Sequence, residues 1–210
     1  MIPSPTPRRA QCPVCVRPQS TCICAFITAV TSPVDLLILQ HPLEVANAKN
    51  SARLLHLSVT GSRLLPGETF SSEQLEALLT AGGRTPVLLY PATSDDSVLV
   101  AQAPPLDPAL LQSPDKLRLV ALDATWRKSR KMLYLNPLLQ QLPRLALSNM
   151  PASNYRIRKA HAPDQLSTLE AVAYALAQLD GDQARSDTLL ATFERFVSQQ
   201  SAFASGLKSA

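Results

Sequence analysis

A mostly apolar run of six residues, 117–122, ends directly at the sequence Asp123-Ala124-Thr125-Trp126. A run of this length that is rich in Leu and Val is typical of a buried β-strand. The residues after it are typical of a helix start, because Asp or Thr can accept the free N–H groups of a first helical turn. The pattern therefore predicts a strand that leads into a helix, with a carboxylate, a hydroxyl and the only tryptophan at the carboxyl end of the strand.

Strand and helix patterns alternate along the rest of the chain. Further strands are predicted at residues 34–39, 86–90, 97–101 and 144–148. Further helices are predicted at residues 45–58, 73–81, 168–179 and 187–203. This alternation predicts an α/β fold with a mostly parallel sheet and helices on both faces. Ligands bind such sheets at the carboxyl ends of the strands, which makes the surroundings of Asp123 a candidate site.

The composition narrows the class of protein. Hydrophobic residues make up 46% and charged residues 17% of the 210 residues, which excludes a disordered chain. The length suits one folded domain with a small appendage. Because no apolar run could span a bilayer and the Pro-rich first residues lack a signal-peptide core, we expect a cytoplasmic protein. The net charge of +4 permits binding to nucleic acid without requiring it.

All the cysteines lie between residues 12 and 24. Two closely spaced pairs of thiolates can surround Zn²⁺ tetrahedrally, and in a cytosolic chain such a cluster is more typical of a metal site than of disulfides. With four protein ligands, no coordination position stays open, so the zinc is expected to be structural. Free or redox-active thiols are the alternative. The predicted metal ligands are Cys12, Cys15, Cys22 and Cys24.

Six sequence blocks together resemble the DTW-domain family of tRNA-uridine aminocarboxypropyltransferases, in its bacterial form. They span about residues 11–175, which is most of the chain. The blocks are the cysteine pattern with Arg17-Pro18, His41-Pro42-Leu43-Glu44 followed by residues 49–53, Leu88-Leu89-Tyr90-Pro91, Asp123-Ala124-Thr125-Trp126, residues 155–159 and residues 166–171.

The resemblance implies a SPOUT-like fold whose C-terminal part forms a trefoil knot. It also divides the chain into residues 1–30, a tail with the cysteine module, and residues 31–210, the catalytic domain. The implied reaction transfers the 3-amino-3-carboxypropyl group of S-adenosylmethionine to N3 of a tRNA uridine, at position 47 of the variable loop, and releases 5′-methylthioadenosine. The resemblance implies no obligate protein partner and activity as a monomer.

Two other functions stay open at this point. No residue by itself decides which carbon of S-adenosylmethionine is transferred, so an RNA methyltransferase of the same fold is one alternative. A zinc-stabilised protein that binds RNA without catalysis is the other. The cysteine module itself fits either an RNA contact or a purely structural clasp for the N-terminal segment.

Asp123 is the candidate catalytic residue, because a carboxylate can take the N3 proton of the uridine during attack. It could equally hold the amino group of the substrate or cap the next helix. The residues expected to bind S-adenosylmethionine are Leu89, Tyr90, Pro91, Leu122, Thr125, Trp126, Ser167, Thr168 and Glu170. Simpler roles are the alternative for them: Ser167, Thr168 and Glu170 could cap a helix, and Trp126 could fill the core.

Basic and polar side chains beside these blocks are candidates for tRNA binding, because phosphate contacts would position the RNA. The group after the first strand could also meet the carboxylate of S-adenosylmethionine. Solvated helix faces are the alternative for all of them. The candidate RNA-binding residues are His41, Glu44, Lys49, Arg53, Arg127, Lys128, Arg130, Lys131, Arg156, Arg158 and Lys159.

Overall fold

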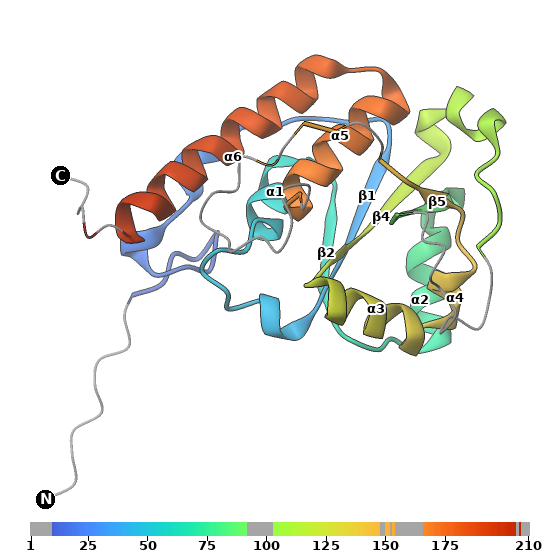
Figure 1. Cartoon of the computed structure of the whole chain (residues 1–210), viewed down its shortest axis with the longest axis horizontal. Helices are drawn as coiled ribbons and strands as arrows, with labels where there is room; N and C mark the ends of the chain where they lie inside the picture. Colours follow the sequence, from blue (N-terminus) through green and yellow to red (C-terminus); the bar gives the residue numbers. More distant parts are fainter. Residues whose placement is uncertain are drawn as a thin grey trace, which may run out of the picture.

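The computed structural model describes residues 10–91, 103–147, 150, 151, 153, 166–204 and 206. A five-stranded parallel sheet with the strand order β2-β1-β4-β3-β5 lies at its centre (Figure 1), which confirms the predicted sheet. The strands are β1 (Asp35–Gln40), β2 (Arg63–Pro66), β3 (Thr85–Leu89), β4 (Leu117–Asp123) and β5 (Arg144–Leu145).

Helices cover both faces of the sheet, as predicted. Side chains of successive strand residues point to opposite faces, so Leu36 and Ile38 belong to one apolar cluster and Leu37 and Leu39 to the other. The first cluster is closed by α1 (Ala52–Ser58), α5 (Thr168–Asp180) and α6 (Gln183–Ala204). The second is closed by α2 (Ser72–Thr80), α3 (Trp126–Leu135) and α4 (Pro137–Gln140).

The predicted helix at residues 45–58 is wrong in its first half. A short 3-10 helix, η3 (Pro42–Glu44), is followed by turns, and α1 begins only at Ala52. The physical reason is local: the Asn47 side chain accepts a hydrogen bond from the N–H of Lys49 at 3.0 Å, and that of Asn50 accepts one from Ala52 at 2.9 Å. Such side-chain bonds to the backbone compete with helix formation.

Other differences are small. Strand β2 was not predicted, and its short edge position with a terminal Pro66 explains the weak sequence signal. Strand β5 ends at Leu145, so the predicted strand at 144–148 is too long through residue 147, and residue 148 lies outside the described residues. The strand predicted at 97–101 lies outside the described residues. Further 3-10 helices are η1 (Gln19–Thr21), η2 (Cys24–Phe26), η4 (Ala81–Gly83), η5 (Pro108–Gln112) and η6 (Pro114–Lys116).

Strands β1 and β4 are neighbours whose chains diverge at their carboxyl ends. After β1 the chain turns toward α1 on one face, and after β4 it enters α3 on the opposite face. The two ends are in register, with Gln40 opposite Asp123. Adjacent parallel strands that diverge in this way leave a crevice where open α/β sheets bind ligands.

Most of the connection from β5 to α5, the C-terminal part for which the knot is predicted, lies outside the described residues. None of the helices in the described part of the chain is long and apolar enough to cross a membrane.

Candidate active site at the carboxyl ends of β1 and β4

Asp123 is the last residue of β4, and its side chain is almost fully buried. Its Oδ2 atom accepts hydrogen bonds from Gln40 Nε2 at 2.9 Å and from Asn50 Nδ2 at 2.6 Å. Its Oδ1 atom accepts one from Thr168 Oγ1 at 2.7 Å. Asp123 is not the N-cap of α3, because that position belongs to Thr125. The three donors come from separate segments and fix the orientation of the carboxylate.

A carboxylate can accept roughly four hydrogen bonds, so Asp123 keeps capacity for one more from a ligand. The carboxylate lines a pocket that is open to solvent, and its empty space together with the open solvent at its mouth is about 380 Å³. Three segments build this pocket: the turn after η3, the end of β4, and the first residue of α5. The lining residues are Glu44, Asn47, Lys49, Asn50, Ser51, Asp123, Ala124 and Thr168.

The pocket residues Asn47, Asn50 and Ser51 escaped sequence prediction, as did Gln40, which does not line the pocket. Gln40, Asn50 and Ser51 are buried polar residues. Gln40 and Asn50 contact Asp123 directly, whereas the Ser51 hydroxyl accepts a hydrogen bond from the N–H of Leu169 at 3.4 Å. A signal was present for two of them, because Asn50 and Ser51 lie inside one of the family blocks, at residues 49–53.

Glu44 is buried at the rim of the pocket rather than exposed on a solvated face. Its Oε1 atom lies 2.9 Å from Lys128 Nζ, and its Oε2 atom accepts a hydrogen bond from Asn47 Nδ2 at 2.9 Å. The pair joins η3 to α3 across the crevice. Lys49 is exposed on the same rim. The pocket therefore carries two buried carboxylates and one exposed ammonium group.

His41 is buried beneath α3, where it contacts Glu68. Its Nδ1 atom accepts a hydrogen bond from the N–H of Leu43 at 3.1 Å, and its Nε2 atom lies 3.0 Å from Glu68 Oε1. Lys131 lies 3.0 Å from the other oxygen of Glu68. Hydrogen bonds first from His41 and then from Lys131 lower the pKa of Glu68 below its ordinary value.

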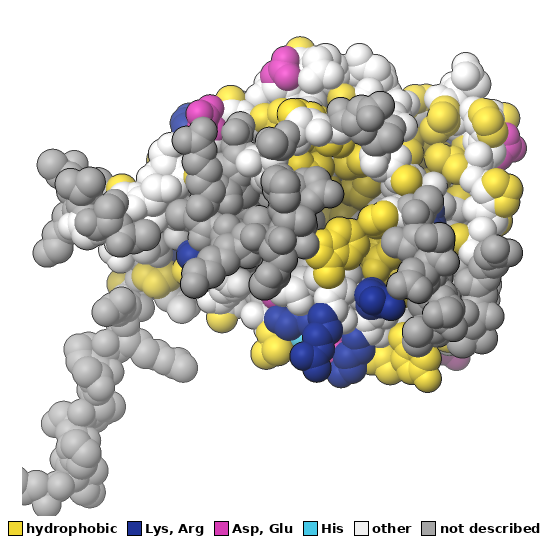
Figure 2. Space-filling model, viewed as in Figure 1, with side chains coloured by type: hydrophobic (Ala, Val, Ile, Leu, Met, Phe, Trp, Pro, Cys, Tyr) yellow, Lys and Arg dark blue, Asp and Glu magenta, His cyan; other side chains and the backbone are white. Residues whose placement is uncertain are grey.

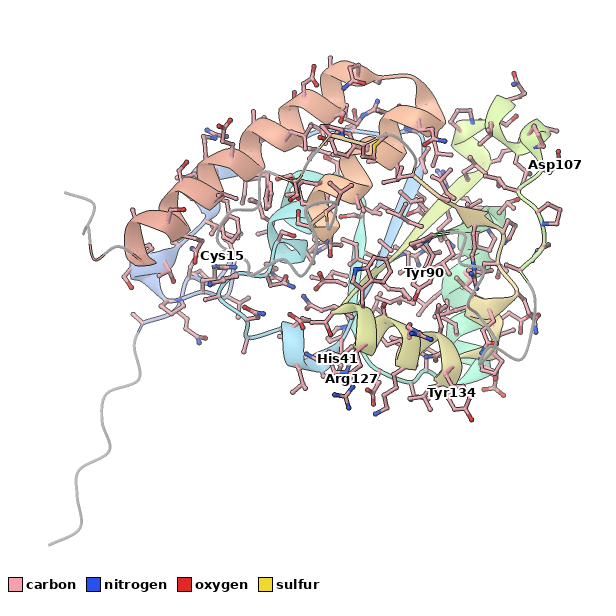
Figure 3. All side chains as sticks on the ribbon, viewed as in Figure 1. Cys15, His41, Tyr90, Asp107, Arg127 and Tyr134 are labelled. Carbon is pink, nitrogen blue, oxygen red and sulfur yellow. The ribbon has the colours of Figure 1, made fainter. Side chains whose placement is uncertain are left out.

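The basic residues on α3 are of two kinds. Lys128 and Lys131 form ion pairs with acidic residues, whereas Arg127 and Arg130 are exposed and have no ion pair with a described residue. Figure 2 shows Lys and Arg side chains gathered over α3, and Arg127 points outward from this helix in Figure 3. Arg53 points elsewhere, because its Nη2 atom donates to the carbonyl of Val14 at 2.8 Å in the cysteine segment.

Tyr90 and Trp126 meet edge to face, with ring centroids 5.8 Å apart. Tyr90 is buried, and the guanidinium of Arg144 lies 5.4 Å from the centre of its ring. Trp126 is 47% exposed, so the alternative interpretation, that it fills the core, is wrong. Leu89 and Leu122 are partly buried against the two apolar clusters, and Pro91 is partly exposed.

The start of α5 combines capping with contact to the site. Ser167 Oγ accepts a hydrogen bond from the N–H of Glu170 at 3.2 Å, and Glu170 Oε2 accepts one from the N–H of Ser167 at 2.8 Å. This reciprocal pair is a capping box, which confirms the capping alternative for these two residues. Thr168 alone of the three contacts Asp123. Arg156, Arg158 and Lys159 lie outside the described residues.

The cysteines form a second cluster, in which all four sulfur atoms lie within 4.8 Å of one another. None of them forms a disulfide. The sulfur atoms of Cys12 and Cys24 are 3.6 Å apart, and those of Cys15 and Cys22 are 3.7 Å apart. Four thiolates at about 2.3 Å from one tetrahedral ion would lie about 3.8 Å apart. The cluster could therefore hold a metal ion.

The surroundings of the cluster shift the pKa values of its thiols in opposite directions. Hydrogen bonds from the backbone N–H groups of Cys15 and Val14 lower the pKa of Cys12 to about 6. Burial, followed by hydrogen bonding with Cys12, raises the pKa of Cys24 to about 12. The lowered pKa of Cys12 favours its thiolate, which is the form that binds metals.

Three curated proteins illustrate what the chain is similar to. It is 31% identical over 202 residues to tRNA-uridine aminocarboxypropyltransferase 2 of Macaca fascicularis, a match that covers 93% of this chain and 65% of that protein. The protein of the same name from Mus musculus is 29% identical over 199 residues, covering 92% and 64%. That from Drosophila melanogaster is 30% identical over 192 residues, covering 89% and 73%. The chain thus spans slightly less than two thirds of the length of the first two proteins.

No solved structure matches the chain. The family model described as the DTW domain matches residues 9–201, a range that contains the cysteine cluster, the pocket and the capping box of α5. The chain therefore belongs to the DTW domain family.

Proposed function

We propose that this protein transfers the 3-amino-3-carboxypropyl group of S-adenosylmethionine to a tRNA uridine. The reaction class comes from the relatives, which are named tRNA-uridine aminocarboxypropyltransferases. The observation that carries the proposal here is the pocket at the ends of β1 and β4, where three segments of the family domain converge on the buried carboxylate of Asp123.

The charges of the pocket suit the amino-acid end of S-adenosylmethionine, which carries an ammonium and a carboxylate. Asp123 and Glu44 are partners for the ammonium, and Lys49 is a partner for the carboxylate. Tyr90 and Trp126 supply apolar and aromatic surface for the adenosine, as in small-molecule sites that combine apolar walls with a few polar groups.

The proposed step is a displacement at the γ-carbon of the transferred group. The uridine N3 forms a bond to that carbon, the carbon–sulfur bond breaks, and its electron pair stays on sulfur to give neutral 5′-methylthioadenosine. The N3 proton leaves to a base, and Asp123 is the proposed acceptor. The alternative role of Asp123 is to hold the substrate ammonium. The three hydrogen bonds that it accepts favour the charged carboxylate, and a charged carboxylate attracts an ammonium group. Both roles place Asp123 against the substrate.

Mass spectrometry of tRNA nucleosides tests the reaction class. Incubation of unmodified tRNA with the protein and S-adenosylmethionine is expected to produce a uridine heavier by one aminocarboxypropyl group, together with methylthioadenosine. An added methyl group with S-adenosylhomocysteine would instead identify a methyltransferase. Sequencing of the modified tRNA then locates the uridine, which we propose to be that at position 47 with modification at N3.

We propose that tRNA lies across the exposed face of α3, where the side chains of Arg127 and Arg130 are exposed. The affinity for tRNA should then fall with salt, with a log–log slope of about 0.7–0.9 per phosphate contact. Replacing both arginines with alanine should weaken binding and reduce the slope by about 1.4–1.8 if each contacts one phosphate. A slope unchanged from that of the wild type would count against this surface.

We propose zinc as the ion of the cysteine cluster, because four thiolates at these spacings match its preferred tetrahedral ligand set. Four protein ligands leave no position for a substrate, so the ion would support the fold. The proposal also includes four further predictions: a knotted C-terminal part, a boundary between two domains at residue 30, action as a monomer and a cytoplasmic location.

A further inference from the structure

Arg17 links the cysteine cluster to the pocket. Its backbone is part of the turn that carries Cys12, because the N–H of Cys12 donates to the Arg17 carbonyl at 2.8 Å and the N–H of Val16 donates to the Cys12 carbonyl at 2.9 Å. Its side chain reaches the loop at residues 47–51. There Nη1 donates to the carbonyl of Ala48 at 2.8 Å, and Nη2 donates to that of Asn50 at 3.0 Å.

The loop to which Arg17 donates, residues 47–51, lines the pocket and is called the pocket loop. Asn50 is held from both sides: Arg17 binds its backbone carbonyl, while its side-chain Nδ2 donates to Asp123 at 2.6 Å. Its Oδ1 atom also accepts a hydrogen bond from Gln40 Nε2 at 3.2 Å. Residues 47–50 belong to no strand or helix, and within them the N–H of Asn50 donates to the carbonyl of Asn47 at 2.9 Å. Side-chain contacts such as those of Arg17 must therefore hold this turn in place against the rest of the molecule.

We propose that Arg17 is a positioning residue, which sets the pocket loop against Asp123 and couples the shape of the pocket to the cysteine module. The planar guanidinium suits this task, because it can donate to two carbonyl groups in a fixed geometry that the single ammonium of lysine cannot reproduce. The consequence for catalysis rests on the proposed function. The consequence for the order of the loop does not.

Arg195 provides a matched control. It also ties the segment after the cysteines to the rest of the molecule, since its Nη2 atom donates to the carbonyl of Phe26 at 2.8 Å and lies 3.0 Å from Thr28 Oγ1. Neither Phe26 nor Thr28 is among the residues that line the pocket. Replacing Arg195 therefore removes a comparable anchor while leaving the pocket loop in place.

The experiment compares the zinc-loaded wild type with R17A, R17K and R195A in the full chain. Amide hydrogen exchange over residues 47–51 should become at least about tenfold faster in R17A, because the loop loses two backbone anchors. R17K keeps a positive charge on this side chain but can hold only one carbonyl, so its exchange rate should lie between those of the wild type and R17A. R195A should exchange like the wild type in this loop.

Kinetics then test the consequence for the site. R17A should raise the KM for S-adenosylmethionine by about tenfold and leave the KM for tRNA within about twofold, because the loop lines the former's pocket. Loop exchange in R17A and R17K equal to that of the wild type would overturn the inference, whatever the protein catalyses. If the wild type transfers no group, the proposed function fails while the exchange measurement still decides the role of Arg17.

Discussion

Asp123 shows how a single residue gains a role from its partners. Its carboxylate receives hydrogen bonds from Gln40, Asn50 and Thr168, which come from β1, the pocket loop and α5. Burial without such donors would be costly for a charged group, so the three contacts both stabilise the carboxylate and fix its direction. A residue that only capped α3 would not need donors from three separate segments.

Replacement of Asp123 with alanine is expected to lower the rate of group transfer by about 10²–10⁴-fold, the usual contribution of a positioned general base. Calorimetry with S-adenosylmethionine separates the two proposed roles. Unchanged affinity indicates a base, and lost affinity indicates a holder of the substrate ammonium. The control is T168V, which keeps the carboxylate and removes only its contact with Oδ1. Turnover close to normal in D123A, with zinc and fold intact, would contradict any catalytic role.

Glu68 makes stability depend on pH at the underside of α3. Its hydrogen bonds with His41 and Lys131 lower its pKa below the ordinary 4.5. A carboxyl group with a lowered folded-state pKa stabilises the fold above its unfolded pKa, and this stabilisation is lost as pH falls through the folded pKa. In urea unfolding, E68Q should therefore be less stable than the wild type at neutral pH, and the difference should shrink in acid as the pH falls below 4.5 and through the lowered folded-state pKa. A difference that is the same at both pH values would exclude this linkage.

At the scale of elements, the start of α5 shows that one short sequence can serve two purposes. Ser167 and Glu170 satisfy each other and the free N–H groups of the helix, while Thr168 between them reaches the site. Sequence alone could not separate capping from ligand binding, because both use the same hydroxyl and carboxyl groups. The hydrogen bonds assign Ser167 and Glu170 to the helix.

Replacement of Ser167 with alanine should consequently lower the free energy of unfolding by about 1 kcal/mol, as for other N-cap losses. The KM for S-adenosylmethionine should change little, because the effect is on the helix rather than on a ligand contact. Urea unfolding and steady-state kinetics check the two parts. A large rise in KM without loss of stability would instead return Ser167 to the set of ligand-binding residues.

The pocket loop illustrates where periodicity fails. Residues 45–58 carry apolar residues at helical spacing, yet the first half turns instead because Asn47 and Asn50 bond to the backbone just after them. In α1 the periodicity holds, and Ala52 and Leu55 are buried. The local turn is what brings Asn50 against Asp123, so the error in the prediction falls on the part of the chain that builds the site.

At the scale of the whole molecule, the N-terminal segment is joined to the main core. Cys12, Cys15 and Ile23 belong to the same apolar cluster as the buried residues of α5 and α6. Gln199 on α6 also donates to the carbonyl of Cys22 at 3.1 Å. A metal ion in the cysteine cluster would therefore stabilise more than its own short loops.

Removal of the metal with a chelator is expected to lower the melting temperature by roughly 10 °C. This is the effect of losing an ion whose concentration is well above its dissociation constant. The protein as purified should contain one zinc per chain, measured by elemental analysis. Addition of zinc should restore the melting temperature. A chain without bound metal and with an unchanged melting curve would contradict a structural metal site.

The sequence alone determined the class of fold and the sheet edge at which the candidate site lies, because both depend on local patterns. Apolar strands alternating with amphipathic helices require a covered parallel sheet, and the polar residues that follow β4 stand at its carboxyl edge whatever the details. The cysteine spacing likewise limits the cluster to a small volume. These features follow from neighbours in the chain.

Only the tertiary structure decided which side chains share the pocket. Asp123 and Thr168 lie 45 positions apart and Asp123 and Asn50 lie 73 apart, yet each pair is hydrogen-bonded. Such partners depend on strand order, register and the path of turns, which are set by packing across the whole sheet rather than by local preference. For the same physical reason, only the folded chain revealed that Glu44 and His41 are buried and that Arg17 reaches the pocket loop.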